Sequence, residues 1–374
     1  MEKLPEAAVA AAASDVPIDV ICGILSYLPV KSVLRFRCVS KSWCSLINDS
    51  HFKRSHLLQS RDQVLVRQLQ CPDKYYSFHG GPFFDDIVSG ESREMESLFP
   101  RIPNPPICNA TKLLAACDGL LLMKNCDNGQ LTLLNPSTGQ CRNLQDVKYD
   151  FASPGGRCCY GLGYDSSTDD YKILVLADYH FEKERRLKTE TKLFSVKTNC
   201  WRKVKSPGMS NNNAVNLNGC MIWVSTLYWK SNGMHLNKIV SLSLADETII
   251  EMEHPYYYYD EIPWPDVGVL QGCVCLTVAG SRSLTIWLMK EFGVTSSWTK
   301  VITLPNLDFR RATPLPVNHM NKTVFLLDGW VNGVELLILN DLEAEDYKIV
   351  KITNFPRRNF PHLLTFSRSL ISPN

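Results

Sequence analysis

The sequence predicts a small all-α module of three helices followed by a large all-β domain, which we interpret as a β-propeller of about six blades. Apolar residues recur at helical spacing between Asp15 and Leu58, and after Asp62 they alternate in short runs. In this second part, turns that contain glycine return at a nearly regular interval. A chain of 374 residues with 45% hydrophobic content can bury a core in both parts. The predicted domains are therefore residues 15–60 and residues 62–374.

The helical module begins where Asp15 can cap the first helix and Pro17 fits its first turn. Pro29 ends this helix, a second one starts near Val30, and Ser40 can cap a third. The residues expected to face inward are Ile18, Ile21, Leu25 and Leu28, then Val30, Val33, Leu34 and Cys38, and finally Trp43, Leu46 and Ile47.

The larger part contains a weak internal repeat. "CDGLLLM" is followed by "LTLLNPSTGQCRNL", and "LQGCVCLTV" by "LTIWLMKEFGVTSSWTKV". The marker glycines are Gly119, Gly163, Gly219, Gly272 and Gly329, at successive spacings of 44, 56, 53 and 57 residues. A period of about 50 residues made of strand pairs is typical of the four-stranded blades of a kelch-like β-propeller. A β-sandwich-like all-β domain is the alternative.

The two ends of the all-β part complete the repeat. "DQVLVRQ" with "KYYSFHG" opens a further unit beyond the five marked by glycines. The strand "LLTFSRSLIS" near residue 370 falls outside those five units, and we expect it to pair with the first blade. A ring closed in this way leaves no long free edge.

Charge and cysteine usage exclude several classes of function. Lys plus Arg number 40 and Asp plus Glu number 38, so we expect neither a nucleic-acid nor a membrane partner. The 14 cysteines are scattered without metal-ligand spacing, which favours free thiols in a reducing compartment and no metal or cofactor. No segment approaches the roughly 18 apolar residues that span a bilayer. We expect a soluble protein of the cytoplasm and/or nucleus, with residues 1–14 as a disordered leader.

With these two parts, the chain resembles the large plant family of F-box proteins that carry a C-terminal F-box-associated (kelch-like) domain. "DVPIDVICGILSYLPVKSVLRFRCVSKSWCSLINDSHFKRSHL" is similar to the opening pattern of the family. "CDGLLLM", "LNPSTG", "GLGYDSSTDDYKI", "NCWRKV" and "SSWTKV" follow in the family's order. The departures are few: Val16 stands where Leu is usual, and Gly23 where an acidic residue is common.

The resemblance implies a substrate receptor of an SCF (Skp–cullin–F-box) ubiquitin ligase, which is not itself an enzyme. The helices would bind a Skp-type adaptor and through it a cullin, while the β domain holds a protein target for ubiquitination and proteasomal degradation. The basic, apolar stretch "LPVKSVLRFRCVSKSW" then becomes a docking helix with a positive rim. The positions expected to bind the adaptor are Pro17, Ile18, Ile24, Leu25, Leu28, Pro29, Val30, Leu34, Arg35, Val39 and Trp43.

For the target, the sequence offers long irregular loops at about 80–106, 179–190, 205–214 and 254–266. In "HPYYYYDEIPWP" the aromatic side chains provide large contact area at low entropic cost. The candidate target-binding residues are Tyr256, Tyr257, Tyr258, Tyr259 and Trp264. The alternative is that every second tyrosine packs inward on a strand.

Other functions have less support. Kelch-like propellers can host oxidases, but the sequence contains no H-E-x-x-H, G-x-S-x-G, Walker loop or Cys/His ligand cluster. The cations Lys31, Arg35, Arg37 and Lys41 surround their helix instead of forming the single stripe of a nucleic-acid reader. A third possibility is an adaptor-binding F-box protein that sequesters its partner without degrading it, for example in immune regulation or self-incompatibility-type recognition.

Overall fold

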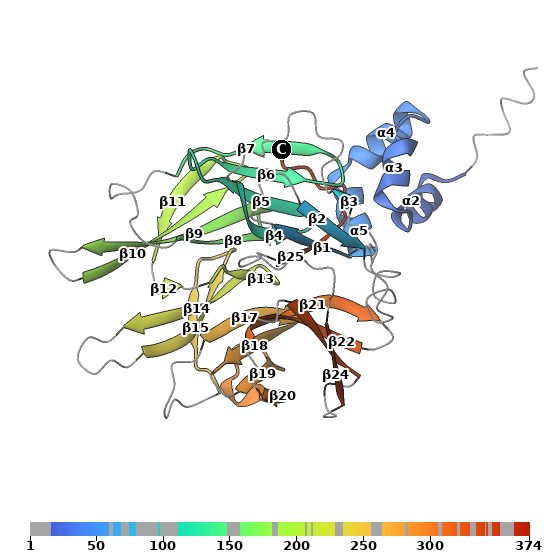
Figure 1. Ribbon diagram of the computed structural model, residues 1–374. Coiled ribbons are helices and arrows are strands. Elements are labelled where there is room, and N and C mark those ends of the chain that lie inside the picture. The colour runs from blue at the N-terminus through green and yellow to red at the C-terminus, as the bar shows by residue number, and fades with distance from the viewer. Residues whose placement is uncertain are drawn as a thin grey trace, which may run out of the picture.

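In the computed structural model, a group of helices lies against one side of a larger part made of β-sheets (Figure 1). The structure describes residues 16–59, 63–68, 75–79, 96–97, 111–147, 158–181, 186–205, 208–210, 212–228, 235–255, 264–280, 283–305, 309–319, 322–329, 334–340, 342, 346–351 and 363–374. The leader predicted for residues 1–14 and the predicted cap Asp15 lie outside these residues.

The described part of the helical module contains four helices where the sequence predicted three. They are α2 (Ile18–Ser26), α3 (Val30–Phe36), α4 (Lys41–Asn48) and α5 (Ser50–Gln59). As predicted, Ser40 caps α4, since its Oγ accepts a hydrogen bond from the backbone N–H of Trp43 at 3.2 Å. The helix that the sequence analysis missed, α5, is capped by Asp49, whose side chain accepts a hydrogen bond from the N–H of Phe52 at 3.0 Å.

The helices pack around one apolar core. The helices contribute Leu25, Val30, Val33, Ile47 and Phe52 as its buried members, with Ile21, Leu28, Leu34, Phe36, Trp43 and Leu46 partly buried against them. Two of the residues predicted to face inward do not: Ile18 and Cys38 are exposed. Cys38 lies beyond the end of α3, where helical spacing no longer applies, and Ile18 lies in the first turn of α2.

Within the described residues, six antiparallel sheets form the β domain, each one blade of a β-propeller. Blade one contains β1 (Gln63–Gln68), β2 (Tyr75–His79), β3 (Glu96–Ser97) and β25 (Leu363–Ser367). Blade two contains β4 (Thr111–Cys117), β5 (Leu120–Asn125), β6 (Leu131–Asn135) and β7 (Gln140–Asn143). Blade three contains β8 (Cys158–Asp165), β9 (Asp170–Phe181), β10 (Arg186–Ser195) and β11 (Cys200–Val204).

The remaining blades follow the same up-and-down order. Blade four contains β12 (Met209–Ser210), β13 (Val215–Leu217), β14 (Cys220–Tyr228), β15 (His235–Ser243) and β16 (Ile249–Met252). Blade five contains β17 (Trp264–Leu270), β18 (Cys273–Ala279), β19 (Ser283–Met289), the 3₁₀ turn η1 (Thr295–Ser297) and β20 (Trp298–Pro305). Blade six contains β21 (Phe309–His319), β22 (Lys322–Gly329), β23 (Val334–Leu339) and β24 (Tyr347–Lys351). The predicted propeller of about six blades is confirmed, and the sandwich alternative is wrong.

The ring closes where the sequence predicted. β25 pairs antiparallel with β1, with Leu65 opposite Thr365, and β1 pairs with β2. Blade one is therefore built from both ends of the propeller sequence, which removes two free strand edges.

Three of the five marker glycines lie at equivalent positions, in the two-residue turns that follow β4, β13 and β17. Gly119, Gly219 and Gly272 have positive φ, and so does the residue before each of them. Two-residue turns with both φ values positive strongly favour glycine. Gly163 instead lies inside β8, and Gly329 ends β22, so these two markers do not occupy the turn.

The helices contact one face of the ring, which we call the helical face. It contains the turns at 118–119, 166–169 and 218–219, and Arg54 of α5 forms an ion pair there with Asp118. Because successive strands run in opposite directions, the β9–β10 and β14–β15 hairpins end at the other face, which we call the opposite face. Figure 1 shows both hairpins extending away from the helices.

Two adjacent asparagines connect the blades near the axis of the ring. Asn213 donates from Nδ2 to the backbone oxygen of Leu114 in β4 at 2.6 Å and accepts from the N–H of Tyr160 in β8 at 3.0 Å. Asn212 donates to a backbone oxygen of β17 at 3.2 Å and accepts from Arg311 in β21 at 2.7 Å. Part of the segment 205–214, predicted as an irregular loop, is therefore a structural crosslink among blades two, three, five and six.

A buried ion pair joins blades three and four. Lys172 Nζ donates to Asp165 Oδ2 at 2.6 Å and to the backbone oxygen of Leu244 at 2.5 Å. Burial alone would raise the pKa of the Asp165 carboxyl, but hydrogen bonds from Lys172, Thr168 and Ser167 hold this pKa well below its usual value of 3.8. The carboxylate is thus stabilised as the anion in the folded state.

The lowered pKa predicts a loss of stability in acid. The carboxyl of Asp165 binds a proton less readily in the native state than in the unfolded chain. The contribution of this carboxylate to the free energy of unfolding is therefore present above about pH 4 and is lost as the pH falls below that value. Asp165→Asn leaves the Lys172 ammonium buried without its anion, and we expect it to cost about 3 kcal/mol or more at pH 7. Urea unfolding at pH 7 and at lower pH measures this effect. The free energy of unfolding of Asp165→Asn should depend less on pH than that of the unmodified chain.

Asp127→Asn is the control, because it removes an exposed carboxylate from the β5–β6 turn and leaves the buried pair intact. Parallel pH curves for Asp165→Asn and the unmodified chain would contradict the assignment.

Candidate functional site

Helix α2 is apolar on two faces. One face packs inward through Ile21, Leu25 and Leu28. The other presents Val20, Ile24 and Tyr27 at spacings of four and three residues, and these three side chains are between 49% and 74% exposed. Large apolar side chains gathered on one exposed face mark an interaction surface. We call these three residues the α2 stripe.

The predicted adaptor-binding residues fall into three groups by burial. Pro17, Ile18, Ile24, Pro29, Arg35 and Val39 are exposed, Leu28, Leu34 and Trp43 are half-buried, and Leu25 and Val30 are buried. Leu25 and Val30 belong to the packing of the module, each with 1% exposure. The adaptor contact predicted for all eleven stays a prediction, and the exposed group provides the accessible surface for it.

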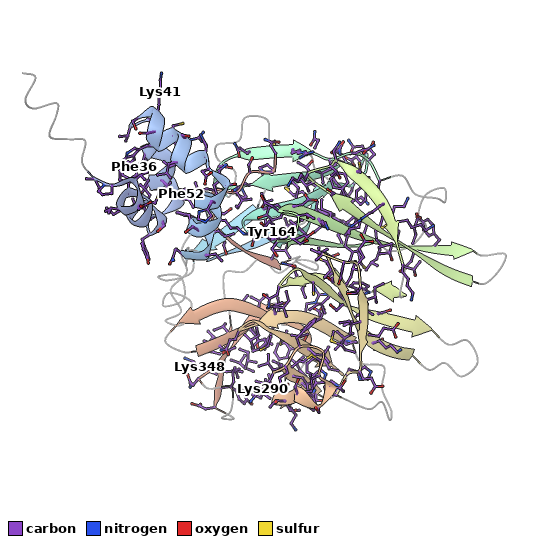
Figure 2. All side chains as sticks on the ribbon, turned by 180° about the vertical axis from the view of Figure 1, so that it is seen from behind. Phe36, Lys41, Phe52, Tyr164, Lys290 and Lys348 are labelled. Atoms are coloured by element: carbon purple, nitrogen blue, oxygen red, sulfur yellow. The ribbon has the colours of Figure 1, made fainter. Side chains whose placement is uncertain are left out.

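The helical module also carries exposed cations. Lys31 and Arg35 on α3 and Lys41 at the start of α4 are exposed. Figure 2 shows the Lys41 side chain pointing outward from the helices. Exposed cations around an apolar surface favour a partner with negative charge and increase its rate of encounter.

Arg54 of α5 fixes the helices to the propeller. Its guanidinium forms an ion pair with Asp118, donates to the Tyr171 hydroxyl at 3.1 Å and lies 3.4 Å from the centre of the Tyr164 ring. The Tyr171 hydroxyl in turn donates to Asp118 at 3.0 Å. We call Arg54, Asp118, Tyr164 and Tyr171 the Arg54 junction; Tyr164 is labelled in Figure 2.

The ionisation of the junction favours its charged hydrogen bonds. Burial would lower the pKa of Arg54, but the Asp118 carboxylate outweighs it and raises this pKa. Burial, and then the charge of Asp118, raises the pKa of Tyr171, which stays protonated as a donor. Burial and the hydrogen bond to Asp169 raise the pKa of Tyr164 to about 12. The Arg54 guanidinium and the hydroxyls of Tyr164 and Tyr171 therefore keep the same protonation state around neutral pH.

The predicted target residues Tyr256, Tyr257, Tyr258 and Tyr259 lie outside the described residues, as does the side chain of Trp264, whose backbone begins β17. The loop predicted at 179–190 is largely strand, because β9 and β10 pair from Phe181 and Arg186 inward. What was expected to be a loop is an extended hairpin of the opposite face.

No cluster of metal ligands occurs among the described residues. They include no group of three or more His, Cys, Asp or Glu side chains placed to hold a metal ion.

An open cavity of about 350 Å³ lies between blades two and three, lined by Gln145, Asp146, Lys192, Cys200, Trp201, Arg202 and Lys203. Of its two lysines, Lys192 is paired with Glu190 at 2.9 Å, and the Trp201 indole donates to the backbone oxygen of Gln145 at 2.9 Å. No helix among the described residues is long and apolar enough to cross a membrane.

Sequence reasoning missed two parts of the site. The α2 stripe was detectable, because Val20 and Tyr27 lie four and three residues from Ile24 along the predicted helix. The Arg54 junction had no local signal, since its members come from α5, the β4–β5 turn and the strands β8 and β9.

Comparison with known protein families agrees with this architecture. Residues 13–55 match the F-box domain model, and residues 89–373 match the model of the F-box associated beta propeller domain. The F-box protein CPR1 of Arabidopsis thaliana is 30% identical over 91% of this chain and 85% of its own length. The F-box/kelch-repeat protein At3g23880 of the same plant is 26% identical over 79% of this chain and 82% of its own.

The Arg54 junction predicts a stability effect. Arg54→Ala leaves Asp118 without its cation, and we expect a loss of about 2 kcal/mol in the free energy of unfolding, the usual range for a hydrogen bond to a charged group. Arg54→Lys should recover less than half of it, because an ammonium lacks the flat fork that stacks on Tyr164. Guanidinium denaturation measures both variants. Lys31→Ala, an exposed cation on α3, is the control. Unfolding of Arg54→Ala at the same denaturant concentration as the unmodified chain would refute the role of the junction.

Proposed function

The chain belongs to the plant F-box proteins that carry an F-box-associated β-propeller domain, and on this premise we propose that it is the substrate-recognition subunit of an SCF ubiquitin ligase. The F-box docks to a Skp-type adaptor and through it to a cullin. The propeller holds a protein target while a separate enzyme transfers ubiquitin, so this chain performs no chemistry itself. The observation that carries the proposal is the exposed α2 stripe on a module fixed to a propeller.

Adaptor binding is supported by the chemistry of the α2 stripe. Burying a large apolar side chain against a partner gives about 1.5–3 kcal/mol when it is fully removed from water. Val20, Ile24 and Tyr27 offer such area on one helix face. The exposed cations Lys31 and Arg35 suit an acidic adaptor. An apolar centre with a charged rim is the usual arrangement of a specific protein interface.

We assign target binding to the opposite face of the propeller. Blades three and four contain the longest hairpins of that face, with β9 of 12 residues, β10 of 10 and β14 and β15 of 9 each. They extend away from the helices (Figure 1). An adaptor bound at the helices leaves this face accessible to a target. The free cysteines of the described residues suit the reducing cytoplasm and nucleus, where we place the protein.

Degradation and sequestration of the target differ in one measurement. We expect proteins that co-purify with the full chain to have a shorter half-life in cells that express it, and a proteasome inhibitor to restore the half-life. An unchanged half-life of every captured protein would favour sequestration and contradict the degradative role.

The α2 stripe predicts the effect of a single truncation. Ile24→Ala should weaken binding of a purified Skp-type adaptor to the full chain by about tenfold, because it removes apolar contact area from the centre of the interface. Ile250→Ala is a matched control, since Ile250 is an isoleucine of β16 with 46% exposure, compared with 58% for Ile24. Isothermal titration calorimetry measures both. Equal affinity of Ile24→Ala and the unmodified chain would reject the docking surface.

A further inference from the structure

Residues 368–374 follow β25 and lie against both the helices and blade two; we call them the 368–374 segment. Asn135, the last residue of β6, holds it in place. Its Nδ2 donates to the backbone oxygens of Ser369 at 3.1 Å and Ile371 at 2.7 Å, and its Oδ1 accepts from the N–H of Ser137 at 2.8 Å. Asn135 and Ser369 are both 0% exposed. One buried amide thus connects the segment to the propeller.

Consecutive residues of the segment enter two different cores. Leu370, 3% exposed, belongs to the helical core together with Leu25, Val33 and Ile47. Ile371, 9% exposed, belongs to the core between blades two and three. In an extended segment, neighbouring side chains point to opposite sides. The helical module therefore takes one of its core residues from a segment more than 300 positions later in the chain.

The β4–β5 turn is shaped to receive this segment. A Cβ on Gly119 would lie 2.1 Å from Ser369 Oγ and 2.7 Å from the backbone oxygen of Ser367, so only glycine fits beside the segment. The preceding residue, Asp118, pairs with Arg54 of α5. A single turn of the propeller thus contacts both α5 and the 368–374 segment.

Ring closure determines where the segment lies. It continues directly from β25, which is held by its pairing with β1, and β1 comes next after α5 in the chain. We propose that the 368–374 segment is a structural part of the adaptor-binding module, with Leu370 as its positioning residue, so that the docking surface forms in full only on a closed propeller. The effect on adaptor binding rests on the proposed function, whereas the packing role of Leu370 does not.

Hydrogen exchange of the full chain tests the core contact without any partner. Leu370→Ala leaves a cavity in the helical core, and we expect amide exchange in α2–α5 to accelerate by about tenfold or more, with β8–β11 unchanged. Ile371→Ala is the matched control one residue later, and it should accelerate exchange in blades two and three instead. If the two variants change the same region, or if Leu370→Ala leaves the helices unchanged, the proposal is wrong.

Adaptor titration supplies the second readout. We expect Leu370→Ala to weaken adaptor binding by about fivefold or more and Ile371→Ala to leave it within twofold, because only the former loosens the helices under the α2 stripe. Faster exchange in the helices with unchanged adaptor affinity would overturn the coupling. If the unmodified chain does not bind the adaptor, the proposed function fails, and the exchange result still decides the role of the segment. Leu370→Met, which nearly conserves volume, replaces Leu370→Ala if that variant does not fold, and it should show a smaller effect in the same helices.

Discussion

The antiparallel pairing of β25 with β1 is the interaction on which the rest of the structure depends. It joins the two ends of the propeller sequence in one sheet, with Val66 opposite Leu364. Without it, blade one loses a strand and both β1 and β25 present unpaired backbone edges. Its formation requires the closure of a loop that spans nearly the whole domain, an entropy cost that grows only slowly with loop length. The pairing also brings the 368–374 segment to the helices, so it defines the junction of the two domains.

Polar side chains then hold neighbouring blades together where apolar packing does not specify their alignment. The indole of Trp201 in blade three donates to Gln145 after blade two, and that of Trp298 in blade five donates to Glu253 after blade four at 3.1 Å. Near the axis, Asn213 satisfies backbone groups of β4 and β8. Buried backbone groups that lose such a partner cost about 1–3 kcal/mol each. These contacts link blade two to blade three and blade four to blade five at specific atoms, a constraint that apolar surfaces alone do not provide.

The sequence predicted the elements with local signals and missed those made by distant contacts. Strand pairs, ring closure and the Ser40 cap follow from alternation, turn residues and spacing. Helix α5 was missed because its inward face is largely polar or amphipathic: Arg54 meets the propeller, and His56 Nε2 lies 2.8 Å from the backbone oxygen of Leu28. The same reason hid the crosslink at Asn212, since an asparagine in a polar run is indistinguishable from a loop residue until its partners in other blades are known.

The motifs that carry the family resemblance are used inside the molecule. Gly119 of "CDGLLLM" and Asn135 of "LNPSTG" receive the 368–374 segment, and Tyr164 of "GLGYDSSTDDYKI" stacks on Arg54. All three lie at the helical face, where the side chains of Asn135 and Tyr164 are occupied by intramolecular contacts and Gly119 leaves room for the segment. Residues that hold the F-box on the propeller must keep their chemistry whatever the target is. On the proposed function, target specificity comes from other residues, which we assign to the opposite face; this face lies at a distance from the helices, where a change in sequence leaves the junction intact.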